Sequence, residues 1–118
     1  MKQTDIAIIG AGLAGSTAAA MLGRAGVAAV LVDPHAVYPP DFRIEKLHGG
    51  EQVARFRRTG IAEPVLRQAT LDGVNWIARF GHLLDKAPSQ QYGMTYDTLV
   101  TAIRAEIPVS SIGSSPRR

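Results

Sequence analysis

The sequence predicts an α/β fold, in which helices flank a parallel sheet, and three observations support this prediction. An apolar run at residues 6–9 ends in the pattern Gly-x-Gly-x-x-Gly, an alanine-rich segment follows the glycines, and a second apolar run at residues 28–32 ends in Asp33. Short apolar runs rich in branched side chains are typical of parallel strands that are covered on both faces. Strand, glycine-rich turn, helix, strand and acidic residue follow one another in this order in dinucleotide-binding units, so the expected sheet is Rossmann-like.

Each glycine of the turn is expected to have its own structural role. Gly10 permits a tight turn, Gly12 leaves room for a pyrophosphate beside the backbone, and Gly15 lets the helix pack closely on the strand. The first turn of the helix then points unpaired N–H groups and the positive end of its dipole at the phosphates. The candidate cofactor-binding residues of this turn are Gly10, Ala11, Gly12, Leu13, Ala14 and Gly15.

Asp33 is the candidate ribose-binding residue. It follows Gly10 at close to the spacing of about 20 residues that such units show. Its carboxylate would accept hydrogen bonds from the ribose hydroxyls and would repel a 2'-phosphate, so the expected cofactor is FAD or NAD and not NADP. The alternative is an ordinary strand–helix–strand unit in which the glycines serve packing alone.

The first helix and the loop after the second strand follow from local patterns. The helix is expected over residues 14–24 with Gly26 as its C-terminal cap, while Pro34 ends the strand at residues 28–32 and opens a loop over residues 34–42. Three- and four-residue spacing predicts one apolar face on this helix. That face comprises Leu13, Thr17, Ala18, Met21, Leu22 and Ala25.

The middle of the chain predicts smaller elements. Residues 43–48 are expected to lead into a helix over residues 51–59 that Gly60 ends, and a short helical turn is expected over residues 62–68. Short strands at residues 74–77 and 79–84 would form a hairpin-like excursion, and a loop would follow at residues 87–93.

The last predicted helix begins after Thr95 and runs to about residue 106. Thr95 is a suitable N-terminal cap, and Asp97 places a negative charge in the first turn, where the helix dipole favours it. Pro108 ends this helix, and Val109 is expected to open a third parallel strand. The chain would thus form one partial Rossmann-like domain over residues 1–109 with a disordered tail at 110–118. The buried stripe of the last helix is expected to comprise Leu99, Ile103 and Ile107.

The composition argues against several other kinds of function. The chain has 118 residues, 46% of them apolar and 19% charged, and it has no cysteine, which removes disulfides, thiolate metal sites and cysteine nucleophiles. Its net charge is +3, and no aromatic residues interleave with the arginines, so nucleic-acid binding is not expected. The three histidines have no partners at metal-ligand spacing, so no metal site is expected. No membrane span or export signal is expected either, and the predicted location is cytoplasmic.

The order of the motifs resembles the N-terminal part of FAD-dependent monooxygenases of the p-hydroxybenzoate hydroxylase type. Besides the glycine turn and Asp33, the resemblance rests on Arg43, on the helix near residues 52–60 and on the run 92–99, and it covers nearly all of residues 5–109. It implies that the turn and Asp33 hold the ADP half of FAD and that Arg43 lies near the diphosphate and the nicotinamide cofactor. The chain departs from the family at Met94, near a polar flavin contact, and at Tyr96, where relatives often have arginine.

Members of that family are longer, and they continue with further strands and a separate sheet that holds the substrate. The resemblance therefore implies a truncated flavoprotein with an incomplete sheet, which is not expected to complete catalysis alone and for which no catalytic residue is assigned. Three functions stay open: an FAD-binding segment of a monooxygenase-like oxidoreductase, an NAD-binding module that acts with another chain, and a non-catalytic remnant or interaction module. An unpaired sheet edge would favour a complementing chain or self-association.

Overall fold

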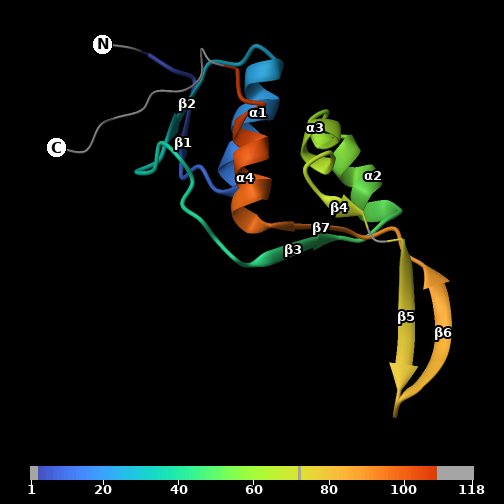
Figure 1. Ribbon diagram of the computed structural model, residues 1–118. Coiled ribbons are helices and arrows are strands. Elements are labelled where there is room, and N and C mark those ends of the chain that lie inside the picture. The colour runs from blue at the N-terminus through green and yellow to red at the C-terminus, as the bar shows by residue number, and fades with distance from the viewer. Residues whose placement is uncertain (1–2, 72, 109–118) are drawn as a thin grey trace.

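The computed structural model describes residues 3–71 and 73–108, and its first three elements form the predicted unit (Figure 1). Strands β1 (Ile6–Ile9) and β2 (Ala29–Val32) pair in parallel, with Ile6 opposite Ala29 and Ile9 opposite Val32, and helix α1 (Leu13–Arg24) connects them. The prediction of a parallel pair joined by a helix is confirmed. The helix begins one residue earlier than predicted, and the second strand one residue later.

The face of α1 that packs inward is not the one predicted. The buried residues of α1 are Ser16, Ala19 and Ala20, whereas Leu13 and Met21 are 37% and 42% exposed. The prediction followed apolar character, but close helix packing selects small side chains, and these three lie at helical spacing on a different face.

Helix α1 ends as Gly26 predicts. The N–H of Gly26, at φ +75°, donates to the carbonyl of Gly23, and the N–H of Val27 donates to that of Leu22. These two bonds form a Schellman motif, which satisfies carbonyl groups that the helix leaves unpaired.

Helix α4 (Tyr96–Arg104) lies alongside α1 and closes the main core (Figure 1). The predicted stripe is confirmed, because Leu99, Ile103 and Ile107 are all buried. The C-terminal part of α1 is tied to the residues after α4 by an ion pair in which Arg24 Nη2 lies 2.5 Å from Glu106 Oε2. The core between these helices also contains Ala11, Ala19, Ala20, Leu31, Ile61, Val65 and Met94.

A small antiparallel sheet was not predicted. Strand β7 (Tyr92–Thr95) lies between β3 (Ile44–Leu47) and β4 (Thr70–Leu71) and pairs with both. The lead-in to a helix expected at residues 43–48 is instead strand β3, so that prediction was wrong. Of the loop expected at residues 87–93, residues 89–91 lie outside the strands, while the rest belongs to β6 and β7. These short strands carry charged residues and a glycine, which local pattern disfavours, and they form because partners distant in sequence supply the hydrogen bonds.

Two short helices cover the same sheet. Helix α2 (Glu51–Arg57) and helix α3 (Ala62–Leu66) occur where helices were predicted, and each ends two residues earlier than expected. Gly60 has a φ of +77° and turns the chain between them, as its position predicted. A second buried cluster, to which Leu47 and Tyr92 also pack, comprises Val53, Ala62 and Leu66.

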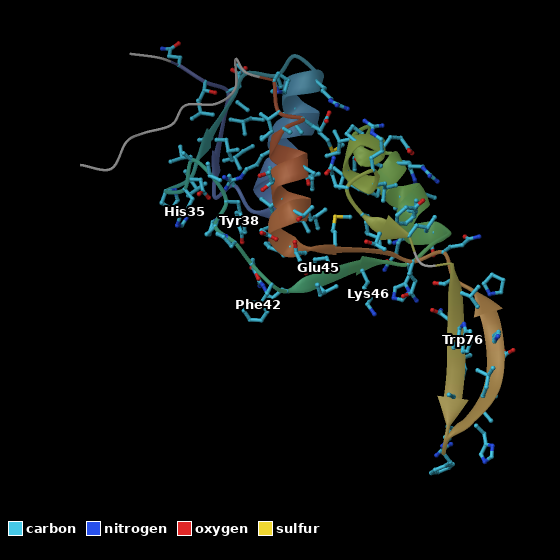
Figure 2. The ribbon with its side chains drawn as sticks, viewed as in Figure 1. His35, Tyr38, Phe42, Glu45, Lys46 and Trp76 are labelled. Carbon is cyan, nitrogen blue, oxygen red and sulfur yellow. The ribbon has the colours of Figure 1, made fainter. Side chains whose placement is uncertain are left out.

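Strands β5 (Val74–Arg79) and β6 (His82–Pro88) form a hairpin, as predicted, which projects away from the helices (Figure 1). Its strands are longer than the expected 74–77 and 79–84, and the second begins three residues later. The chain turns at Phe80 and Gly81, which both have positive φ. Every residue of β5 is exposed, including Trp76 at 67%. Figure 2 shows Trp76 on this hairpin, on the opposite side of the molecule from the labelled His35 and Tyr38.

The predicted third parallel strand at Val109 and the tail at 110–118 lie outside the described residues. The division into a domain at residues 1–109 and a tail therefore stays a prediction. Among residues 3–71 and 73–108, no helix is long and apolar enough to cross a membrane.

Candidate functional site

The glycine-rich turn between β1 and α1 has the geometry that its glycines predict. Gly10 adopts a φ of +97°, and its N–H donates to the carbonyl of Val32 at 2.8 Å, which ties the turn to the end of β2. A Cβ atom at Gly15 would lie 1.8 Å from the carbonyl oxygen of Gly10. Only glycine fits at this position, because α1 passes directly over the backbone of the turn.

Asp33 lies at the tip of β2 and bonds directly to this turn. Its Oδ2 accepts a hydrogen bond from the N–H of Ala11 at 2.7 Å, and its Oδ1 accepts one from the N–H of His35 at 2.8 Å. Burial raises the pKa of Asp33, but the bonds from Ala11 and His35 and the charge of Arg104 outweigh burial and hold the pKa below its usual value. The carboxylate is therefore ionised at neutral pH. Its oxygens retain lone pairs for further donors, since an ionised carboxylate accepts about four hydrogen bonds.

Arg104, at the end of α4, holds the turn and the tip of β2 together. Its Nε donates to the carbonyl of Ala11 at 2.9 Å, its Nη1 donates to the carbonyl of His35 at 3.0 Å, and its Nη2 lies 3.5 Å from Asp33 Oδ1. The carbonyl of Ala11 accepts a second bond from the hydroxyl of Ser16 at 2.9 Å. The Nη2 atom is buried and has no hydrogen-bond partner among the described residues, so its main interaction is with the charge of Asp33.

Tyr96, the first residue of α4, contacts the other side of the turn. Its hydroxyl oxygen accepts a hydrogen bond from the N–H of Leu13 at 3.3 Å. The ring of Tyr38 meets the ring of Tyr96 edge-on, with 5.6 Å between centroids. Figure 2 shows Tyr38 and His35 near the same end of the β1–β2 pair.

Arg43 packs against Tyr96, which itself contacts the glycine-rich turn. Its guanidinium carbon lies 4.6 Å from the centroid of the Tyr96 ring, and its carbonyl accepts a hydrogen bond from the N–H of Tyr96 at 2.8 Å. The Nε of Arg43 also donates to Asp41 Oδ2 at 2.9 Å, and the side-chain hydrogen bond from Arg43 lowers the pKa of Asp41. The charge of Arg43 is thus partly compensated, and its side chain is 61% exposed.

The structure therefore brings most of the predicted residues together and adds three. The turn from Gly10 to Gly15 and Asp33 form one site, and Arg43 lies at its border. The contacts of Tyr38, Tyr96 and Arg104 were not predicted from the sequence. A signal was present for two of them, because Tyr96, Val100 and Arg104 recur every four residues and so share one face of the predicted helix.

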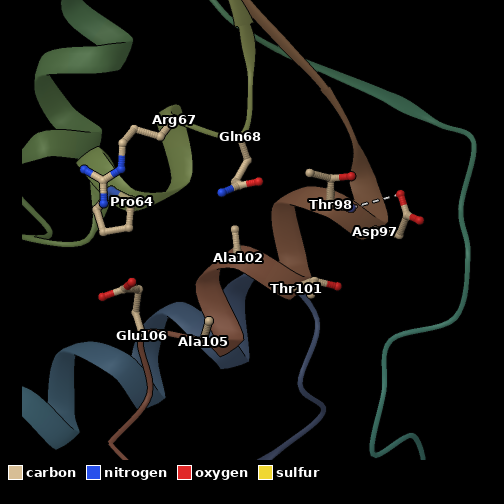
Figure 3. Close-up of a pocket in the computed structure, with 9 residues that line it drawn as sticks. All are labelled: Pro64, Arg67, Gln68, Asp97, Thr98, Thr101, Ala102, Ala105 and Glu106. Carbon is tan, nitrogen blue, oxygen red and sulfur yellow. Dashed lines mark hydrogen bonds between the residues drawn. The ribbon is translucent and has the colours of Figure 1, made fainter.

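The groove between α3 and α4 is a separate feature (Figure 3). It has a volume of about 430 Å³, and its lining includes small apolar side chains, uncharged polar ones and charged ones of both signs. No residue of the glycine turn lines it, and neither does Asp33. Within residues 3–71 and 73–108, no group of three or more potential metal-ligating side chains is close enough to hold a metal ion.

Comparison with known proteins points to one family. Its sequence profile, described as FAD binding domain, matches residues 3–105. No curated protein sequence matches the chain significantly.

Solved structures share the fold. Aklavinone-11 hydroxylase in a complex with FAD and aklavinone is 21% identical with a TM-score of 0.67, and p-nitrophenol 4-monooxygenase from Pseudomonas putida is 18% identical with a TM-score of 0.73. A variant of 2-methyl-3-hydroxypyridine-5-carboxylic acid oxygenase is 19% identical with a TM-score of 0.70. The matches cover 97%, 92% and 96% of this chain but only 26%, 31% and 32% of those proteins, so the chain spans less than a third of their length. Since the profile covers nearly all of the described residues, the chain belongs to the FAD binding domain family.

Proposed function

We propose that the chain holds the ADP half of FAD between the glycine-rich turn, the N-terminus of α1 and Asp33. The observation that carries this proposal is the position of the Asp33 carboxylate, which follows β2 and accepts a hydrogen bond from the N–H of Ala11 in the turn. A carboxylate in this position can accept hydrogen bonds from ribose hydroxyls, and the amide groups at the start of α1 can receive the phosphates.

The residues present fit such a cofactor. Gly15 allows α1 to approach the turn, and at Gly12 a Cβ atom would meet one atom within 4 Å, the hydroxyl oxygen of Tyr96 at 3.5 Å. Arg104 keeps the turn and the strand tip in fixed relation through its bonds to Ala11 and His35. Arg43 would contribute positive charge at the border of the site. A bound flavin would supply the redox chemistry, while these residues would bind and orient its nucleotide half.

The proposal extends to the kind of enzyme in which this site would act. The solved structures that share the fold include a monooxygenase, an oxygenase and a hydroxylase, so we propose that this chain is the FAD-binding segment of a monooxygenase-like oxidoreductase. The family supports FAD, and none of the comparisons supports NAD as the cofactor. Catalysis would need a complementing chain or self-association, for which the exposed apolar hairpin and the short sheets offer edges. A cytoplasmic location is also a proposal, since it rests on the sequence alone.

Calorimetric titration with FAD and ADP tests the nucleotide site. FAD and ADP should both bind, and Asp33→Ala should weaken binding by about 1–3 kcal/mol, because ribose hydroxyls lose a charged acceptor. The matched control is Asp85→Ala, which removes an exposed carboxylate on β6 and should leave both affinities unchanged. Equal affinity in the wild-type and Asp33→Ala chains would contradict the proposed site.

A further inference from the structure

We infer that the hydroxyl of Tyr96 relays the hydrogen-bonding capacity of the α1 N-terminus to a phosphate of the cofactor. The hydroxyl oxygen accepts from the N–H of Leu13, and its own proton would be donated to a phosphate oxygen. This inference rests on the proposed function and assigns to it a further contact, through a side chain that belongs to α4 and lies 83 residues from Leu13 in the sequence.

The position of the hydroxyl supports this role. It lies at the start of α1, 3.3 Å from the nitrogen of Leu13 and 3.5 Å from the point where a Cβ of Gly12 would stand. Both positions belong to the segment expected to face a pyrophosphate. The hydroxyl is therefore beside the path of a phosphate and not in the interior of the core.

The hydroxyl also has one hydrogen-bonding function left. A tyrosine hydroxyl can accept hydrogen bonds and can donate one. Tyr96 uses an acceptor position on the N–H of Leu13, and its proton has no acceptor among the described residues. A phosphate oxygen is a strong acceptor for such a donor, and a hydrogen bond to a charged group is stronger than one between neutral groups.

The ring of Tyr96 is held from several directions, so the hydroxyl needs little rearrangement to bind. Its edge contact with Tyr38 and the guanidinium of Arg43 on its face restrict the ring. The N–H of Tyr96 donates to the carbonyl of Arg43, which fixes the backbone at the start of α4. Groups held in place before binding lose less conformational freedom when the ligand arrives.

The two arginines near the rings of Tyr96 and Tyr38 favour an anion, but their charges are partly compensated. Arg43 lies on the face of Tyr96, and Arg104 lies over Tyr38 with 5.4 Å between its guanidinium carbon and the ring centroid. Each arginine also faces a carboxylate, Asp41 for Arg43 and Asp33 for Arg104. The neutral donor of Tyr96 would therefore carry a larger share of phosphate binding than in a site with an uncompensated cation.

A hydroxyl that competes with the phosphate would have the opposite effect on binding. If the hydroxyl only occupied the N–H of Leu13, it would compete with the phosphate, and its removal would strengthen binding. Tyr96→Phe keeps the ring and removes the hydroxyl, so the direction of its effect decides between the two roles.

The experiment measures the affinities of ADP and adenosine for the wild-type chain and for Tyr96→Phe. We expect ADP to bind about tenfold more weakly to Tyr96→Phe, the loss of one hydrogen bond to a charged oxygen. Adenosine has no phosphate, so its affinity should not change. Tyr92→Phe is the matched control, because it removes a hydroxyl on β7 outside the site and should leave the ADP affinity unchanged.

A second variant keeps the test decisive if Tyr96→Phe is poorly folded. Leu13→Pro removes the N–H that positions the hydroxyl, at the first residue of α1, where proline is well tolerated. It should weaken ADP binding severalfold and leave adenosine binding unchanged. Unchanged or tighter ADP binding by the Tyr96→Phe and Leu13→Pro variants would overturn the relay and leave the proposed function intact. Absence of ADP and FAD binding in the wild-type chain would overturn the proposed function itself.

Discussion

The nucleotide unit and the β5–β6 hairpin differ in how closely they pack against the rest of the chain. In the nucleotide unit, here β1, α1, β2 and α4, each element packs on another, and Ile103 is fully buried. In the hairpin, Phe80 is 86% exposed and Leu84 is 62% exposed, and the two strands pair mainly with each other. The difference shows that the candidate site lies where distant segments support one another, while the hairpin depends on its own pairing.

A two-stranded hairpin that stands alone is at best marginally stable in water. Regions with few buried apolar contacts open at lower free energy than the core does. Substitutions in the hairpin should therefore lower the free energy of unfolding least, and substitutions in the nucleotide unit should lower it most.

The largest expected difference comes from removing one buried and one exposed isoleucine. Ile103→Ala should lower the free energy of unfolding by about 2–5 kcal/mol, because it leaves a cavity between α1 and α4. Ile77→Ala, on a hairpin residue that is 48% exposed, should change it by no more than about 0.5 kcal/mol. Urea unfolding followed by circular dichroism measures both values. Similar losses for the two variants would mean that the hairpin is packed against something in solution.

A smaller difference is expected between two glycines. Gly15→Ala should cost about 1–3 kcal/mol, because its Cβ would collide with the carbonyl of Gly10 and push α1 away from the turn. Gly73→Ala is the control, since a Cβ there meets no atom within 4 Å. The same unfolding measurement applies. A Gly15→Ala chain as stable as the Gly73→Ala chain would show that α1 is not seated on the turn as described.

The smallest expected difference is in the dependence of stability on pH. The pKa of Asp33 in the folded chain is below its unfolded value, so its contribution is fully present above the unfolded pKa, near pH 4, and is lost as the pH falls through the folded pKa. Asp33→Asn should therefore flatten the decline in melting temperature below about pH 4. Asp85→Asn on the hairpin provides the comparison, and an equal flattening in both variants would remove the special role of Asp33.

The same division separates what the sequence predicted from what it did not. The strands at Ile6–Ile9 and Ala29–Val32, the helix between them and Asp33 follow from patterns within 30 residues, so local periodicity was enough. In the pairing of β3 with β7, Ile44 lies opposite Thr95, 51 residues later, and Leu47 lies opposite Tyr92, 45 residues later, so these strands form through partners that are distant in the sequence. Arg104 reaches back 93 residues to the carbonyl of Ala11, a contact that no window of the sequence displays. The prediction of the inward face of α1 was wrong for a related reason, since the close approach of α4 decides which side chains of α1 must be small.

The position of Trp76 has a practical consequence for spectroscopy. Trp76 is the only tryptophan of the chain, and it lies on the exposed hairpin with the ammonium of Lys86 3.8 Å from the centroid of its ring. Its intrinsic emission therefore reports the environment of the hairpin and not that of the glycine-rich turn. A change in the emission maximum when a second protein or a second copy of the chain is added would locate contact at the hairpin, while nucleotide binding at the turn should leave that maximum where it was.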